Sequence, residues 1–570
     1  MYKRIIGFVY IALLYQGAFA QDMGSITKQK PFKINGSLSV GAGFYSASGI
    51  PNRREPFRWS LMGSPVVSIY GITFPFSFVV SDQERNFSQP FNQYGVSPYY
   101  KWITLHAGYR NVHFSDYTLA GANFLGGGIE LNPGKFRFGF ISGRFNRAVN
   151  EDSISGLGYL GYIRPVYKRT GYAAKIGIGN NNNYLDFIAF KAKDDIHSIA
   201  PVSSKSMVTP EENAALGVKS HLSFLQNKLI FDLDAGGSLY TKDSRLEKFT
   251  DSAAFPIMPW AGGLVKLNSS SEFSKAVTTS LGYNFRTGSL TGKYQRVDPG
   301  YRSLGAYYFQ EDVEQFTISP SFSMLKGKLY LNLSGGLSHD NLNNKKYATT
   351  KRSIYAANVN IAAGKKFNIG LDYSNFGVNQ RKGIGDFFDD STAMSAINAS
   401  YGTVISYRTA SSDNSITHQV AVSANYQNTN DLNRFTEEYT NAHTFIGSLS
   451  YNLSLVPVKA NASAGITYNN TEVYTGTITN ISPFLRLSKM FLENKLRLSL
   501  SENVQLRQSD GLGDDYTSNT GLAVSYTISK HTIGITGGYL TNKYKIGTSG
   551  GAAAKNFSEI RSNISYSFHF

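Results

Sequence analysis

Long runs of alternating apolar and polar residues recur along this chain and constrain its fold more than any other feature. In the run after Lys228, the odd positions from Leu229 to Leu239 are apolar or small, whereas Asp232 and Asp234 occupy even positions. A period of two residues indicates a β-strand with one apolar and one polar face. Similar runs follow short polar turns and begin after Lys135, Lys228, Lys328, Lys366 and Lys495, and more loosely after Lys530.

The polar face of these runs must meet water, because burying two carboxylates in a dry core is costly. A β-sandwich with one wet surface and a membrane barrel with a wet lumen both satisfy the pattern. The runs extend over about 10 to 14 residues, whereas strands of globular proteins have about five or six. A tilted strand that crosses a bilayer needs about 9–11 residues. The lengths therefore predict an all-β fold, a single large antiparallel transmembrane β-barrel.

The connections at the two ends of these runs differ in length. Those just before each lysine are short, and those at the other ends are long and polar, as at residues 242–272, 297–314 and 376–395. In outer-membrane barrels, short turns lie on the periplasmic side and long loops on the extracellular side. We expect the same arrangement here.

The first residues have the pattern of a secretory signal peptide. Lys3 and Arg4 form a basic start, residues 5–15 form an apolar stretch, and an A-x-A site with Ala18 and Ala20 follows. The apolar stretch is too short for a membrane anchor, which needs about 20 residues. We expect cleavage after Ala20, a short periplasmic segment at residues 21–31, and a barrel over residues 32–570.

Composition narrows the function classes. The chain has no cysteine, which excludes disulfides and cysteine-ligated metals. After the first residues, no stretch approaches about 18 consecutive apolar residues, so transmembrane helices are not expected. The formal charge is +17, but Lys and Arg never form runs longer than two. We expect no nucleic-acid partner, and we expect the basic groups to meet anionic lipid or to line the lumen.

The chain ends on the alternating sequence ISYSFHF, in which Ile564, Tyr566, Phe568 and Phe570 share one face. Together with the signal peptide and the paired hairpins, this end resembles that of large Gram-negative outer-membrane β-barrels. The resemblance implies export to the outer membrane and contact with its lipids, including lipopolysaccharide. It also implies that these four residues form the assembly signal that the barrel-assembly machinery binds. The resemblance is specific for location and architecture and not for function.

Counting alternating runs gives about 25 candidate strands, but bacterial single-chain barrels have an even number. We therefore expect about 24–26 strands, with the error between residues 57 and 131. Either the sequence HFSDYTLAG at 113–121 contains a short strand, or two of the early strands are one. A barrel of this size is too wide for its strand side chains to fill. It either conducts or is plugged by infolded loops or by another protein.

No motif indicates chemistry. The nine histidines are scattered, with no HExxH motif and no G-x-S-x-G sequence. We therefore predict no catalytic, cofactor-binding or metal site. Two acidic loop stretches offer oxygen atoms that suit calcium, but neither has EF-hand spacing, and solvated loops explain them better. The stretches contain Asp386, Asp389 and Asp390, and Asp510, Asp514 and Asp515.

Glu502 is a local anomaly, because its position in the alternation puts it on the predicted lipid face beside Leu500 and Val504. A carboxylate near the middle of the bilayer costs up to about 2 kcal/mol. Three explanations are open: a bulge that shifts the register, a position close to the membrane interface, or a partner protein that covers this wall. The first two are favoured.

Two functions fit this architecture. The first is a porin-like channel or transporter for small solutes, and the second is a non-enzymatic barrel subunit of an assembly, secretion or surface-export complex. An enzyme whose catalytic groups converge from distant strands is a third, less favoured alternative. Protein partners, a homo-oligomer and a monomer remain open. The residues predicted to face the lumen are Asp232, Asp234, Asp372, Arg497 and Arg507.

Overall fold

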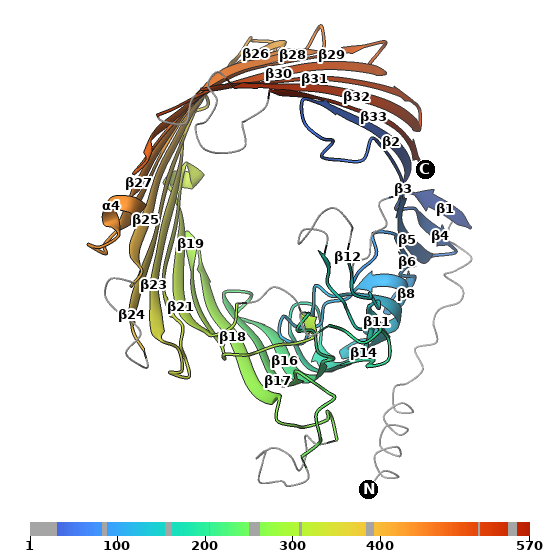
Figure 1. Cartoon of the computed structure of the whole chain (residues 1–570). Coiled ribbons are helices and arrows are strands. Elements are labelled where there is room, and N and C mark those ends of the chain that lie inside the picture. The colour runs from blue at the N-terminus through green and yellow to red at the C-terminus, as the bar shows by residue number, and fades with distance from the viewer. Residues whose placement is uncertain are drawn as a thin grey trace.

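The computed structural model shows a closed antiparallel barrel of 26 strands (Figure 1). It describes residues 31–82, 88–153, 162–203, 206–249, 263–306, 310–383, 393–510, 514–544 and 556–570. Ala18 and Ala20 of the predicted signal peptide and the acidic stretch at 386–390 lie outside these ranges. All the strand pairings of the barrel wall are antiparallel. The prediction of a single large antiparallel β-barrel is confirmed.

The first half of the wall contains β2 (Ser37–Ser48), β3 (Phe57–Gly63), β5 (Ile72–Ser81), β6 (Gln93–Val96), β8 (Ile103–Asn111), β10 (Asn123–Leu131), β11 (Phe136–Asn146), β14 (Arg169–Gly179), β15 (Tyr184–Asp194), β16 (Glu212–Phe224), β17 (Leu229–Thr241), β18 (Ser271–Phe285) and β19 (Gly288–Val297). The second half contains β21 (Val313–Met324), β22 (Leu329–His339), β23 (Ala348–Ala363), β24 (Phe367–Lys382), β25 (Ser395–Ala410), β26 (Ile416–Asp431), β27 (Ala442–Leu455), β28 (Ala460–Val473), β29 (Gly476–Phe491), β30 (Leu496–Ser509), β31 (Asp515–Ile528), β32 (His531–Tyr544) and β33 (Phe557–His569).

The barrel closes where its first strand meets its last. β2 pairs with β33 from Ser37 opposite His569 to Ser48 opposite Ser558. The hydroxyls of Ser39 and Ser567 lie 2.8 Å apart across this seam. Beyond the strand, the backbone N–H of Phe570 donates to the carbonyl of Gly36. The terminal alternating sequence is therefore a full wall strand, and the even strand number brings both ends of the barrel wall to the same rim.

The early part of the chain explains the odd strand count. Residues 57–71 contain two strands, β3 and β4 (Val66–Ile69), and β4 pairs with β1 (Phe32–Asn35) and β5. The missing wall strand is β6, which has only four residues and is too short for alternation to identify it. Both explanations that the sequence left open are wrong, because in the described part of the chain no two early strands merge and no wall strand forms at 113–121. Only β9 (Leu119–Ala120) forms there, and it pairs with β20 (Gly305–Ala306) outside the wall.

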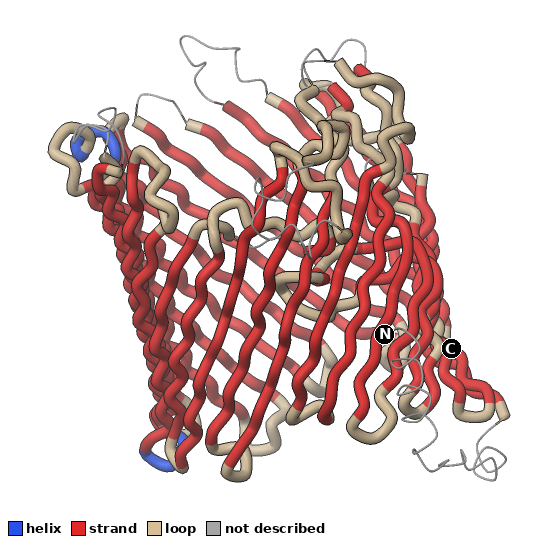
Figure 2. Tube along the Cα trace, turned by 90° about the horizontal axis from the view of Figure 1, so that it is seen from below, coloured by secondary structure: helices blue, strands red, loops and turns tan. Residues whose placement is uncertain are grey.

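The short turns before the lysines follow a common geometry. In three of them the backbone N–H of the lysine donates to the carbonyl three residues earlier, as from Lys228 to Leu225. The last residue before each lysine has a positive φ, at Asn227, Gly327 and Asn494. Asn and Gly tolerate this left-handed conformation better than other residues. The short turns gather at one rim and the longer connections at the other (Figure 2).

The two faces of the wall differ as the alternation predicts. Residues that lie directly opposite one another in neighbouring strands share a face, and the outward positions carry apolar side chains, such as Leu281, Leu337 and Ile560. Leu337 is 63 % exposed to the outside of the wall. Within the described ranges, no helix has the length and apolar character needed to cross a membrane.

Candidate solute pathway inside the barrel

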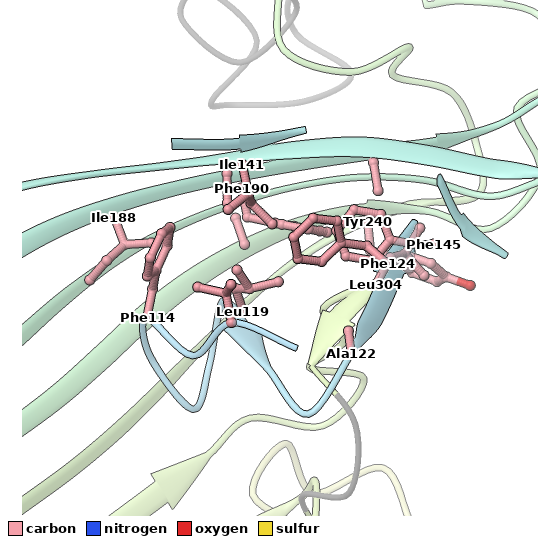
Figure 3. Packing of buried hydrophobic residues seen from close by; sticks show 14 residues of the cluster. Phe114, Leu119, Ala122, Phe124, Ile141, Phe145, Ile188, Phe190, Tyr240 and Leu304 are labelled. Carbon is pink, nitrogen blue, oxygen red and sulfur yellow. The ribbon is translucent and has the colours of Figure 1, made fainter. Parts of the chain in front are cut away.

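Residues 112–122, here called the inner segment, leave the wall after β8 and fold into the lumen (Figure 1). Phe114 and Leu119 pack against Ile141, Ile188 and Phe190, which project inward from β11 and β15 (Figure 3). All five side chains are at most 3 % exposed. The sequence HFSDYTLAG therefore forms a dry core on the inside of the wall, and infolded residues occupy part of the lumen.

A second infolded stretch, residues 298–306, holds the inner segment in place. The hydroxyl of Tyr301 donates to the carbonyl of Tyr117 at 2.7 Å, and the hydroxyl of Ser303 donates to the carbonyl of Thr118 at 2.6 Å. The rings of Tyr117 and Tyr301 pack edge to face, with centroids 5.7 Å apart. Leu304 joins the same buried cluster as Leu119 (Figure 3). These contacts fix the inner segment at both its backbone and its side chains.

Asp234 anchors the inner segment to the wall. Its carboxylate accepts hydrogen bonds from the Ser115 hydroxyl at 2.5 Å and from the Asp116 backbone N–H at 2.9 Å. The ammonium group of Lys219 lies 3.7 Å away. Asp234 thus lies on the inner face, where it was predicted, but it is buried under the inner segment. Asp232, two residues before it, also faces inward and lies 2.6 Å from His221 and 3.1 Å from Ser280.

On the part of the wall that the inner segment covers, most inward charges are paired. Arg137 donates two hydrogen bonds to Asp186, at 2.7 and 2.8 Å. Arg169 contacts both Asp194 and Glu211. Bidentate pairs of this kind fix the guanidinium group and satisfy its charge. These arginines therefore stabilise the wall and have little charge left for a solute.

The other predicted lumen residues lie on the far side of the barrel. Asp372 on β24 faces inward and accepts a hydrogen bond from Asn358. Arg507 on β30 lies 3.1 Å from Asp515, and Asp510 accepts from the Thr477 backbone N–H. Arg497 also faces inward, near the short turn, and forms no ion pair with a described carboxylate. Asp510 and Asp515 are thus bonded to separate partners.

Two inward-facing arginines were missed by the sequence analysis. Arg408 on β25 and Arg486 on β29 lie on the inner face and line a cavity of about 700 Å³ together with Arg497. Neither forms an ion pair with a carboxylate in the part of the chain that the structure describes. Both lie in strands with a two-residue period, so the charge at each inward position of these strands is the sequence signal for them.

Glu502 lies on the outer face, as the alternation predicts. Its strand keeps one register with β29 on both sides of it, from Phe491 opposite Leu496 to Ile478 opposite Ser509. The explanation by a bulge is therefore wrong. The hydroxyls of Ser518 and Thr520 on β31 donate to the two carboxylate oxygens at 2.6 and 2.5 Å. Neighbouring hydroxyls thus satisfy this carboxylate within the wall.

Among the described residues, no three His, Asp or Glu side chains gather as they would around a metal ion. A continuous wall, apolar outside and polar inside, is the decisive feature of the molecule. The chain is a single large antiparallel transmembrane β-barrel.

No family model matches this barrel, and no curated protein sequence matches it. Solved structures similar to it include the P pilus usher PapC translocation pore, with 11 % identity, a TM-score of 0.36, and coverage of 94 % of this chain and 99 % of that one. Acinetobacter baumannii OccAB3 has 14 % identity, a TM-score of 0.30, and coverage of 64 % and 93 %. Pseudomonas aeruginosa OccK8 (OprE) has 10 % identity, a TM-score of 0.31, and coverage of 70 % and 96 %. The function of this barrel is therefore argued from its own geometry.

Proposed function

We propose that this barrel is a channel for small polar solutes that prefers anions. The observation that carries the proposal is the inner wall of β25–β30, which lies outside the described contacts of the inner segment. It presents Arg408, Arg486 and Arg497, none in an ion pair with a described carboxylate. A barrel of more than about 16 strands has a lumen wide enough to leave an aqueous path. Unpaired cations along such a path attract anions and raise their local concentration.

We further propose that the chain is exported, cleaved after Ala20 and inserted in the outer membrane. The apolar outer face supports contact with lipid, including lipopolysaccharide. The outward positions of Ile564, Tyr566 and Phe568 on the last strand support recognition by the barrel-assembly machinery. We propose transport and no catalytic activity, with no nucleic-acid partner.

Single-channel conductance in a planar bilayer, with a salt gradient to measure ion selectivity, tests the channel. We expect stable current steps and a reversal potential on the anion side. The double variant R408Q/R486Q should shift that potential toward the cation side, whereas S450A, an inward neutral substitution on β27, should leave it unchanged. A barrel that is folded but silent would overturn the channel proposal.

One observation favours the second candidate function, a subunit of an outer-membrane complex. An apolar groove of about 1020 Å³ crosses the outer wall of β14–β18, where small residues such as Ala174, Ala189 and Gly237 lie between Phe187 and Phe273. Large exposed apolar concavities can mark protein contacts. Co-purification from membranes tests this function: a stoichiometric partner that is lost in the groove-filling variant A189W would support it.

A further inference from the structure

One row of inward-facing polar residues crosses six neighbouring strands of the far wall. Each member lies directly opposite the next in the antiparallel pairing, so the row runs straight across the strands from β25 to β30. We call it the polar row. Its members are Arg408, Gln419, Asn452, Ser463, Arg486 and Ser501.

The backbone spacing of the two arginines in the polar row is set by the sheet. Arg408 and Arg486 are separated by four strand spacings of about 4.8 Å, or about 19 Å between their backbones. A single small anion cannot bridge that distance, so the two groups fit acidic groups at separate points of one longer ligand. The guanidinium of Arg486 is positioned over the Phe484 ring, 5.2 Å from its centroid. Arginine keeps its charge at any physiological pH.

Neutral hydrogen-bonding groups fill the interval between the two arginines. Gln419 and Asn452 present side-chain amides, and Ser463 presents a hydroxyl that donates to Asn452. Amides donate and accept at once, which suits ligand hydroxyls. The next inward positions toward the short turns are also neutral and polar, and they line the same cavity of about 700 Å³: Thr417, Ser454, Asn461, Ser488 and Ser499.

We propose that the polar row is a binding site for an acidic oligosaccharide, a chain of sugars that carries carboxylate or sulfate groups. The arginines would bind its acidic groups, and the amides and hydroxyls between them would bind its sugar hydroxyls. A neutral sugar chain would leave both guanidinium groups without a partner, and a plain polyanion would leave the amides unused. This inference rests on the proposed channel, because the ligand reaches the row through the lumen.

The test uses the purified full barrel and three probes of similar length: hexagalacturonate, neutral maltohexaose and hexaglutamate. Binding is measured by calorimetry on the detergent-folded protein and by blockade of the ion current. We expect hexagalacturonate to bind most tightly and to block the current. R408Q and R486Q should each weaken its binding about tenfold, which corresponds to one lost charged hydrogen-bond partner. R58Q, an arginine on β3 outside the polar row, is the matched control and should change the affinity little.

Three results would overturn the assignment. Equal binding of hexaglutamate would show that charge alone selects the ligand, and equal binding of maltohexaose would show that the arginines do not contribute. Equal losses in R58Q and R408Q would place the site elsewhere in the lumen. If the barrel binds hexagalacturonate but carries no current, the channel proposal fails and the polar row stands. If the barrel conducts but does not bind hexagalacturonate, the assignment of the polar row fails and the channel proposal stands.

Discussion

The carboxylate of Asp234 on β17 accepts a hydrogen bond from the hydroxyl of Ser115 at 2.5 Å, although the two residues are 119 positions apart in the chain. This contact joins the wall to the inner segment at a point that is buried from water. One charged group of the wall therefore contributes to holding the inner segment in place, beside its apolar core and its contacts with residues 298–306.

Replacing that charge should loosen the inner segment. In D234N, one carboxylate oxygen becomes an amide donor that faces the Ser115 hydroxyl or the Asp116 N–H, which we expect to cost about 2 kcal/mol of docking free energy. Single-channel recording should then show larger or noisier current steps. D232N is the control, because Asp232 lies on the same strand and contacts only wall residues. Identical recordings from D234N and the parent would contradict this prediction.

The dry core under the inner segment can be tested by labelling. Thr118 is fully buried and its hydroxyl has no described partner, so T118C loses no hydrogen bond in a chain that has no other cysteine. We expect this thiol to react slowly with a maleimide. Adding L119A, which removes a fully buried side chain at a cost of about 2–5 kcal/mol, should accelerate the reaction.

The matched control for this labelling is L337A, since Leu337 projects outward from the wall. It should leave the reaction of Cys at position 118 as slow as before. If L337A and L119A accelerated labelling equally, the inner segment would not be packed as described.

Glu502 should reduce the stability of the barrel in lipid. E502L replaces a carboxylate on the outer face by an apolar side chain, and we expect the free energy of unfolding to rise by about 1 kcal/mol in urea titrations of vesicle-bound protein. L500E places a carboxylate on the same face two residues away and should lower it. A loss of stability in E502L would mean that its bonds to Ser518 and Thr520 outweigh the cost of burying the charge in lipid.

The last residues should affect assembly more than stability. Deleting Phe570 removes its backbone bond to Gly36 and its ring contact with Phe568, whose centroid lies 4.9 Å away. We expect less folded, heat-modifiable barrel in cell membranes but normal refolding of the pure protein in detergent. S562A, on the same strand but before the terminal alternating sequence, is the control. Equal losses in cells and in detergent would indicate a structural effect alone.

A short turn offers a pH-dependent test. In the turn between β25 and β26, the hydroxyls of Ser411 and Ser415 donate to the Asp413 carboxylate and lower its pKa to about 2. Because the folded pKa lies below the ordinary value, the turn is stabilised at neutral pH, and this contribution is lost as the pH falls from about 4 through 2.

Carbon NMR of the labelled folded protein would measure this titration directly. The double variant S411A/S415A should raise the pKa of Asp413 toward its ordinary value, whereas S412A should not. An unchanged midpoint in the double variant would contradict the assigned cause.

The wall could be predicted because each residue in it obeys a local rule. The alternation after Lys228 and Lys328, the tight turns before them and the terminal strand through Phe568 depend only on neighbours in the sequence. The same two-residue period predicts the face of the wall on which Asp232, Arg497 and Glu502 each lie. The strand β6 was missed because four residues do not make a periodic pattern.

The inside of the barrel could not be predicted in this way. The sequence HFSDYTLAG has apolar residues, as a strand does, but its partners Ile141, Phe190 and Tyr301 come from distant parts of the chain. Whether such a stretch joins the wall or folds inward depends on those contacts. The polar row is similar: each member is visible in its own strand, and only the register between strands aligns them.

The seam between β2 and β33 also affects how the molecule is made. Ser39 and Ser567 are 528 positions apart, so the seam can close only after nearly all of the strands have been synthesised. Until then the growing sheet has two open edges, each a row of unpaired backbone groups that could join another chain. Such non-local pairing is intrinsically slow. An unfinished sheet of up to 25 strands therefore keeps both edges open to pairing with other chains, and closing this single seam removes both edges at once.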